Sequence, residues 1–118
     1  MDTARFRAML ETTRADVART LAAVTERLAV AQSESGGELS LADQHPADSA
    51  TETEERELDL TRQRMFEARL RRIDAATDRI AKGTYGRCAV CGQPIPEERL
   101  EALPETPWCV KDAAREER

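Results

Sequence analysis

Two stretches of the sequence repeat large apolar residues every seven positions, and this pattern constrains the fold more than any other feature. In the first stretch, residues 1–33, Leu10, Val17 and Val24 recur at that interval, and further apolar residues extend the stripe: Phe6, Met9, Leu21 and Leu28. A seven-residue apolar repeat is the seam of a helical coiled coil. We therefore expect a long helix here that buries one narrow face.

The second stretch repeats the pattern with Phe66, Ile73 and Ile80, and Leu70 lies four residues after Phe66, whereas Thr77 takes the next such position. Two overlapping capping signals precede it, Ser49 with Glu52 and Thr51 with Glu54. They place the start of a second helix near residues 48–51. Gly83 ends this helix after Lys82, because glycine readily adopts the conformation that closes a helix.

A segment rich in turn-forming residues separates the two stretches, including Gly36, Gly37 and Pro46. Neither helix can bury its stripe alone, so the two are expected to pair. The predicted fold is all-α. A long antiparallel helical hairpin, a coiled coil, covers residues 1–82 with a tip loop at 34–50, and residues 83–118 form a small cysteine-containing, zinc-finger-like module with a C-terminal tail.

Composition and charge narrow the function classes. Of the 118 residues only four are aromatic, while 35% are charged, which suits solvated helices with a thin core better than a layered fold. No long apolar run or apolar leader is present, so we expect a cytoplasmic protein without a membrane segment. The net charge of −5 argues against direct DNA binding, which requires a cationic face. Protein partners are expected instead.

The three cysteines are an odd number in a chain expected to be cytoplasmic, which favours a metal or redox role over a disulfide framework. Cys88 and Cys91 form a CxxC knuckle followed by Gly92. After 17 intervening residues comes Cys109, and a second knuckle would place a fourth ligand at position 112, where the chain has Asp112. Zinc accepts carboxylate oxygen, so these four residues predict one Zn²⁺ per chain, held more weakly than by four thiolates.

Two alternatives to zinc remain open from the sequence alone. The CxxC could be a thioredoxin-like redox pair, although that interpretation requires a βαβ context that the sequence lacks. The knuckle could also fold without metal, through the packing of nearby apolar residues: Ile95, Leu100, Leu103 and Trp108.

A known family shares these features. The long helical hairpin followed by a set of motif residues resembles the TraR/DksA zinc-finger family of bacterial transcription regulators over nearly the whole chain; the set is Tyr85-Gly86-x-Cys88-x-x-Cys91-Gly92, Ile95, Arg99-Leu100-x-Ala102-x-Pro104 and Cys109. The resemblance implies that the protein binds RNA polymerase, with the zinc module at the rim of the secondary channel and the hairpin passing down it. The tip would then lie near the active site and alter the stability of promoter complexes.

The family carries a DxxDxA motif at the hairpin tip, and here His45, Asp48 and Ala50 occupy its defining positions. Asp48 and Ala50 match, while His45 replaces the first aspartate, so these three are the expected polymerase-tip residues. Some members also respond to the alarmone ppGpp through basic side chains near the zinc module. Arg72 keeps one such position, but Leu103 and Ala113 replace basic residues, so little ppGpp response is expected.

Charged residues on the second helix have simpler interpretations. Its arginines are expected to form a solvated face that pairs with acids, or to help line a polymerase contact: Arg62, Arg64, Arg69, Arg71, Arg72 and Arg79. Segment 34–59 carries nine acidic side chains and one basic, a net charge of −8. Its cluster of acids would repel nucleic acid or confer solubility: Glu52, Glu54, Glu55, Glu57 and Asp59.

Two function classes follow. The first is the polymerase-binding regulator. The second is a coiled-coil adaptor or dimerisation protein with a degenerate zinc knuckle, in which Asp48 would be dispensable and the apolar stripes would pair between chains. An enzyme is not expected, because no acid, base and nucleophile occur at a recognisable spacing.

Overall fold

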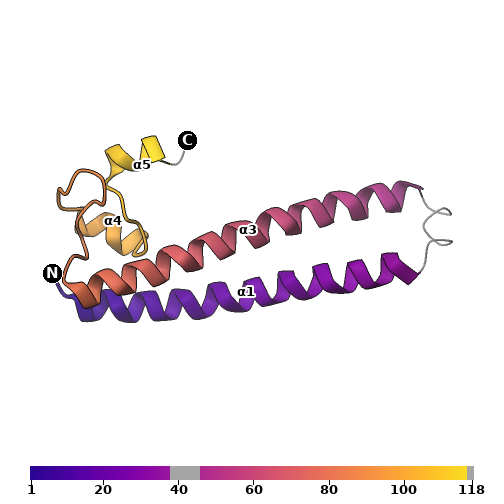
Figure 1. The fold of residues 1–118 in the computed structure, drawn as a ribbon, viewed down its shortest axis with the longest axis horizontal. Helices are drawn as coiled ribbons and strands as arrows, with labels where there is room; N and C mark the ends of the chain where they lie inside the picture. The colour runs from indigo at the N-terminus through magenta and orange to yellow at the C-terminus, as the bar shows by residue number, and fades with distance from the viewer. Residues whose placement is uncertain (38–45, 117–118) are drawn as a thin grey trace. The chain divides into compact units, whose positions relative to one another are not determined.

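A computed structural model of the chain describes residues 1–37 and 46–116, with side chains described for 1–30 and 51–116. The two long helices are α1 (Thr3–Gly37) and α3 (Pro46–Lys82), and the two short ones are α4 (Glu97–Ala102) and α5 (Val110–Glu116) (Figure 1). No strand occurs in these ranges; Arg87 and Pro94 form an isolated bridge. The all-α prediction is confirmed.

The segment between the end of α1 and the start of α3 is shorter than the sequence suggested. We expected a tip loop over 34–50, but α1 continues to Gly37 and α3 already starts at Pro46. Proline is favoured in the first turn of a helix, because its missing N–H would have no partner there and its φ angle suits the helix. The capping residues Ser49 and Thr51 therefore lie inside α3 rather than before it. His45 falls outside the described residues, as do the side chains of Asp48 and Ala50.

The chain divides into two compact units, which we describe separately. Unit 1 contains Met1–Asp16 and Arg69–Arg118, and unit 2 contains Val17–Ala68. The cysteine module thus shares a unit with the adjoining ends of both long helices, whereas the sequence placed its boundary between residues 82 and 83. The reason is packing: Phe6 of α1 is fully buried and its ring lies 5.7 Å from that of Tyr85 in the module.

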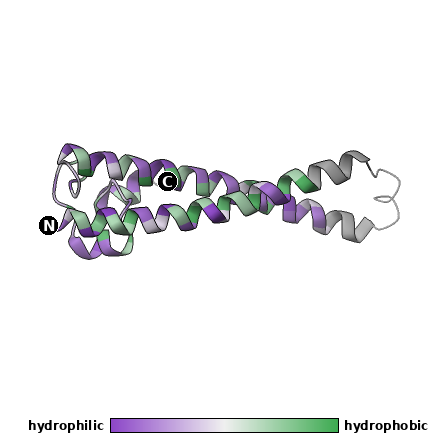
Figure 2. Cartoon of the chain, turned by 90° about the horizontal axis from the view of Figure 1, so that it is seen from below, coloured by the Kyte–Doolittle hydropathy of each residue, from purple (hydrophilic) through white to green (hydrophobic). Residues whose placement is uncertain are grey.

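Within each unit α1 and α3 pair antiparallel along the predicted stripes. In unit 1, Arg14 of α1 pairs with Asp74 of α3; in unit 2, Thr25 contacts Gln63 and Arg27 contacts Asp59. Hydrophobic and hydrophilic residues alternate along both helices (Figure 2). Most stripe members at seven-residue spacing are buried, although Phe66 is only half-buried; the buried ones are Leu10, Val17, Val24, Ile73 and Ile80. None of the described helices is long and apolar enough to span a membrane.

Candidate metal centre

The two halves of the cysteine cluster come from different local structures. Gly83 ends α3 with a φ of 77°, and the chain then turns into the knuckle that holds Cys88 and Cys91. Within the knuckle, the Gly92 N–H donates to the Cys88 carbonyl at 2.9 Å, and Gly92 has a φ of 75°. Because side chains rarely adopt that backbone conformation, glycine is the residue that this turn requires.

The second half is formed by the start of α5. Cys109 precedes this helix, and the Ala113 N–H donates to the Cys109 carbonyl at 2.9 Å, so Asp112 lies in the first turn. Residues three apart on a helical turn project to the same side, which brings Asp112 beside Cys109. The Ala89 N–H donates to the Pro107 carbonyl at 2.8 Å and joins this half to the knuckle.

Side chains before Cys109 fix the position of that second half. The Tyr85 hydroxyl, which is buried, donates to the Pro104 carbonyl at 2.9 Å. The Arg69 Nε of α3 donates to Glu105 Oε1 at 2.8 Å, and Glu105 is itself buried. The Arg99 Nε of α4 donates to the Trp108 carbonyl at 3.0 Å. Three polar anchors from three elements therefore hold residues 104–108, which lead directly into Cys109.

The structure brings all four predicted ligands together. Their ligand atoms lie within 4.8 Å of one another: Cys88 Sγ, Cys91 Sγ, Cys109 Sγ and a carboxylate oxygen of Asp112. Asp112 Oδ2 is 3.0 Å from Cys88 Sγ and 3.2 Å from Cys109 Sγ, and the Cys91 and Cys109 sulfurs are 3.9 Å apart. In tetrahedral zinc coordination with Zn–S bonds of about 2.3 Å, sulfurs lie about 3.8 Å apart. The residues therefore fit a zinc ion.

The protonation of the cluster reflects how closely the four groups approach. Hydrogen bonds from Cys88, then Cys91 and Cys109, lower the pKa of Asp112 to about 2, so the carboxylate is ionised. The Gln93 N–H favours the Cys91 thiolate, but the neighbouring Asp112, burial and the other two thiols outweigh it and raise the pKa of Cys91 to about 12. Binding of a metal cation would favour release of the thiol protons, because the cation stabilises the thiolates beside the Asp112 carboxylate.

The alternatives to zinc find less support in this geometry. All three cysteines are free thiols, and no βαβ unit occurs among residues 1–37 and 46–116 to support a thioredoxin-like pair. The apolar packing expected of a metal-free module is partial: Ile95 and Leu100 are buried, but Trp108 is half-buried and Leu103 is 41% exposed. Leu103 lines a small hollow of about 50 Å³ together with Arg72, Glu105 and Trp108.

Two functional side chains were missed by sequence reasoning. Glu105 and Asp59 are acidic residues that the structure buries, each paired with arginine from another part of the chain. Asp59 had been grouped with the solvated acids of α3, and that interpretation was wrong. The sequence did contain a sign of its burial, because Asp59 lies seven residues before Phe66. It therefore occupies the preceding position of the stripe formed by Phe66, Ile73 and Ile80.

Comparison with known proteins agrees with this site and fold. Residues 83–118 match the prokaryotic dksA/traR C4-type zinc finger. The solved structure of transcription factor DksA2 from Pseudomonas aeruginosa superimposes with a TM-score of 0.73 and 27% identity, covering 96% of this chain and 81% of that one. The C-terminal part of the chain is thus similar to the DksA/TraR zinc finger, and the fold of the chain is similar to that of DksA2. The chain departs from the C4 description at one ligand, since Asp112 stands where the second knuckle would have its second cysteine.

Two curated relatives extend the comparison. The uncharacterised protein YteA of Bacillus subtilis is 51% identical over 71 residues, which make up 60% of this chain and 30% of that protein. The RNA polymerase-binding transcription factor DksA of Haemophilus influenzae is 34% identical over 65 residues, 55% of this chain and 45% of that protein. The matched segments thus span less than half the length of these two relatives.

Proposed function

We propose that the protein is a transcription regulator that binds RNA polymerase and inserts its hairpin tip into the secondary channel, where it alters the stability of promoter complexes. The observation that carries this proposal is the combination of an antiparallel α1–α3 hairpin with the Cys88–Cys91–Cys109–Asp112 cluster, a combination that aligns with DksA2 along 96% of the chain. No catalytic step is part of the proposal.

We assign one zinc ion per chain to the four-residue cluster. With all four positions filled by protein ligands, the ion leaves no open coordination position and therefore serves a structural role. It would join the knuckle after α3 to the start of α5, in addition to the hydrogen bond between Ala89 and Pro107. Asp112 supplies a harder oxygen ligand than a thiolate, so the site should release zinc more readily than a four-cysteine site.

The tip residues of the proposal are His45, Asp48 and Ala50. They lie in or next to the segment between α1 and α3, where the chain carries its most acidic stretch. Asp48 matches the tip motif of the family and is expected to act near the polymerase active site. Because the negative charge of this stretch repels nucleic acid phosphates, the regulator should act through polymerase rather than by sequence-specific DNA contacts. These properties fit a cytoplasmic protein.

We expect the regulator to respond little to ppGpp. Arg72 and Leu103 line the same small hollow, but only Arg72 offers a cation there. Ala113, at the other position where responsive members carry a basic residue, is buried. An enhancement of the transcriptional effect by ppGpp in a purified reaction would contradict this expectation.

The second candidate, an adaptor that dimerises through its stripes, has less support. Several large apolar residues of both stripes are already buried within one chain, including Phe6, Leu10 and Ile73 at 0% exposure, and others such as Phe66 and Leu70 are half-buried. A stripe that is covered by its own hairpin partner has little apolar area left for another chain.

The proposal is tested by co-purification of tagged protein with RNA polymerase, followed by transcription on purified promoters. We expect the wild type and Asp48→Asn to bind polymerase, and only the wild type to change promoter-complex lifetime. Asp78→Asn, which removes an exposed carboxylate elsewhere on α3, is the matched control and should behave like the wild type. Failure of the wild-type protein to bind polymerase would refute the proposal.

A further inference from the structure

The pairing of α1 with α3 in unit 2 depends on a buried acid. Among residues 51–68 of α3, Asp59 is the one that is buried, with 8% of its surface exposed. Leu58 and Met65, large apolar residues of the same segment, are 53% and 63% exposed. On the α1 side of the unit, Val17 and Val24 are buried. Leu60 and Phe66, the other large apolar residues of this segment, are half-buried. Since no apolar side chain of residues 51–68 is buried, apolar packing specifies only weakly how far α3 is shifted along α1 in this unit.

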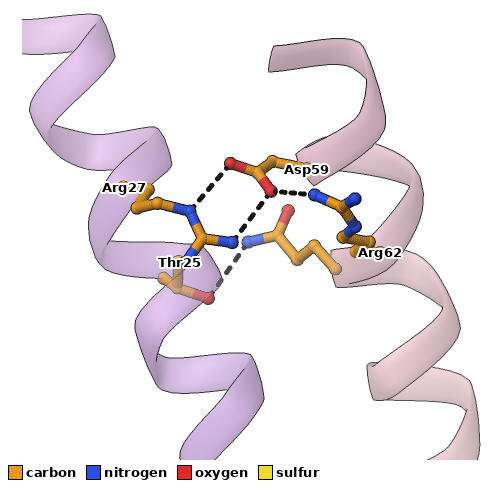
Figure 3. Close-up of polar contacts among 5 residues, drawn as sticks. Thr25, Arg27, Asp59 and Arg62 are labelled. Atoms are coloured by element: carbon orange, nitrogen blue, oxygen red, sulfur yellow. Dashed lines mark hydrogen bonds and ion pairs between the residues drawn. The ribbon is translucent and has the colours of Figure 1, made fainter. Parts of the chain in front are cut away.

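Directional bonds supply the specificity that packing lacks. Arg27 of α1 donates two hydrogen bonds to the Asp59 carboxylate, from Nε to Oδ2 at 3.1 Å and from Nη2 to Oδ1 at 3.0 Å (Figure 3). Arg62 of α3 donates Nη1 to the same Oδ1 at 3.1 Å. Next to this pair, Gln63 Nε2 donates to Thr25 Oγ1 at 3.3 Å and forms a second bond between the helices.

A bidentate ion pair of this kind favours one alignment of α3 along α1 over others, and this effect is larger than its contribution to the overall stability. Removing a carboxylate from water costs nearly as much as its pairing returns, so a buried ion pair contributes little net free energy. A slide of α3 by one helical turn, about 5.4 Å, would break both Arg27 bonds and leave Asp59 without a partner from α1. Polar residues at single core positions fix register in helical coiled coils in the same manner.

We propose that Arg27 and Asp59 form a register lock that holds α3 against α1 within Val17–Ala68. The inference deepens the proposed function and rests on it for its biological purpose. Asp48 lies eleven residues before Asp59 in the same helix, about three helical turns away. The lock therefore determines where α3 presents Asp48 relative to α1, and Asp59 is a positioning residue for the tip.

The two arginines provide a matched pair of variants. Both bind the same carboxylate oxygen, and their side chains are similarly exposed, at 55% for Arg27 and 51% for Arg62. Only Arg27 reaches across from α1, because Arg62 is three residues from Asp59 on the same helix and moves with it. Arg27→Met and Arg62→Met each remove one exposed cation, but only the first removes the lock.

The experiment measures a distance across unit 2 by electron spin resonance. Spin labels are attached to keto-bearing non-natural amino acids at positions 23 and 55, both exposed and offset from one another along the helix axes. A slide of α3 along α1 therefore changes their distance, and the three cysteines stay unmodified. We expect one narrow distance population for the wild type and Arg62→Met. We expect a second population, displaced by about 4 Å, for Arg27→Met, since a slide of one helical turn moves the labels about 5.4 Å along the axis. Identical distributions for the two variants would overturn the proposal.

Asp59→Leu repeats the test with an apolar residue in place of the buried carboxylate. Such replacements commonly keep or raise stability, so this variant remains folded while losing the lock. A second distance population at an unchanged or higher Tm supports the register lock. If Asp59 only stabilised the fold, its replacement would lower the Tm and the distance distribution would keep one population. One narrow wild-type distance in Asp59→Leu would overturn the proposal.

The functional consequence is measured separately in transcription assays. Arg27→Met should reduce the effect on promoter complexes more than Arg62→Met does at equal polymerase occupancy. The distance measurement needs only the isolated protein, so it stands even if the protein does not bind polymerase. The two variants could differ in the spin-label distances but have equal effects in transcription. That result would show that the register does not control the position of the tip, and it would overturn this part of the inference.

Discussion

Asp112 is the residue on which the proposed metal centre differs from a four-cysteine finger. Its Oδ2 lies 3.0 Å from Cys88 Sγ and 3.2 Å from Cys109 Sγ, close enough to share one ion with both sulfurs. Loss of a group that merely orients a ligand commonly lowers metal affinity about 10–100-fold, so loss of a ligand should lower it at least as much. Asp112→Ala is therefore expected to lose zinc to a chelator at least about tenfold more readily than the wild type.

The complementary substitution gives the opposite result. Asp112→Cys supplies a fourth thiolate, a softer ligand that zinc binds strongly, and should retain zinc at chelator concentrations that strip the wild type. Competition with a chromophoric chelator measures both variants, and Asp74→Ala, on the surface of α3, is the control. Equal zinc retention by Asp112→Ala and the wild type would show that Asp112 is not a ligand.

Tyr85 reports on the packing of the module around that centre. Burial raises its pKa to about 12, from an ordinary value of 10.0, and its hydroxyl donates to the Pro104 carbonyl. The folded state thus favours the neutral phenol, so Tyr85 stabilises the fold fully below about pH 10 and this contribution is lost as the pH rises through about 12.

Because Tyr85 is the only tyrosine, its ionisation can be followed directly by the near-ultraviolet absorbance of tyrosinate. We expect a midpoint near 12 in the folded protein and near 10 in denaturant. Tyr85→Phe should abolish the signal and cost about 1 kcal/mol of stability at neutral pH, the usual contribution of one hydrogen bond. A folded-state midpoint near 10 would mean that Tyr85 is not enclosed in the module.

At the scale of helices, the pairing of α1 with α3 should depend on pH through Asp59. The hydrogen bond from Arg27, reinforced by Arg62, outweighs burial and holds the pKa of this carboxyl below its ordinary value of 3.8. Its contribution to stability is therefore present above about pH 4 and is lost as the pH falls through the lowered pKa.

Urea unfolding of wild type and Asp59→Asn at several pH values measures this contribution. The wild type should be more stable at pH 7, and the difference should shrink towards zero in acid, where both side chains are uncharged. Asp74→Asn, which removes the exposed partner of Arg14, should show a smaller difference at every pH, because exposed pairs contribute little. A constant difference from neutral to acid would contradict the assigned role of the Asp59 charge.

Much of the helical architecture could be predicted because its signals are local. The seven-residue spacing of Val17, Val24 and Ile73 identified residues that the structure buries, and Gly83 identified the end of α3. The start of α3 was misplaced, because Pro46 initiates the helix before the capping residues do. The burial of Asp59 required knowing that Arg27 faces it, which depends on how the helices pair rather than on either helix alone.

The clustering of the four candidate ligands could be predicted from spacing, since Cys88 and Cys91 are separated by two residues and so are Cys109 and Asp112. The supporting anchors could not. Arg69 and Glu105 are 36 residues apart, and nothing local to either marks them as partners. Such long-range pairs follow from the assembled unit, in which Met1–Asp16 lies together with Arg69–Arg118.

For the molecule as a whole, the division into two units predicts how it responds to loss of zinc. The metal cluster lies within unit 1, so stripping the metal with a chelator should accelerate amide hydrogen exchange at buried sites of that unit such as Phe6, Ile73 and Leu100. Val24 and Asp59, in unit 2, should keep their exchange rates. Measurement by mass spectrometry of the whole chain with and without chelator, using Asp112→Ala as a second zinc-depleted sample, distinguishes the units. Unchanged exchange at residues 85–113 after zinc loss would contradict a structural role for the metal.

We propose that the segment between α1 and α3 enters the secondary channel of RNA polymerase. A photo-crosslinking amino acid at Leu41 tests it most directly, because it reports the polymerase residues that the tip meets. We expect cross-links that map to polymerase peptides lining the channel beside the active site, and a probe at Thr12, an exposed position of unit 1, to give none of these. Cross-links from position 41 only to the outer surface of polymerase, or none from a protein that co-purifies with it, would contradict insertion of this segment into the channel.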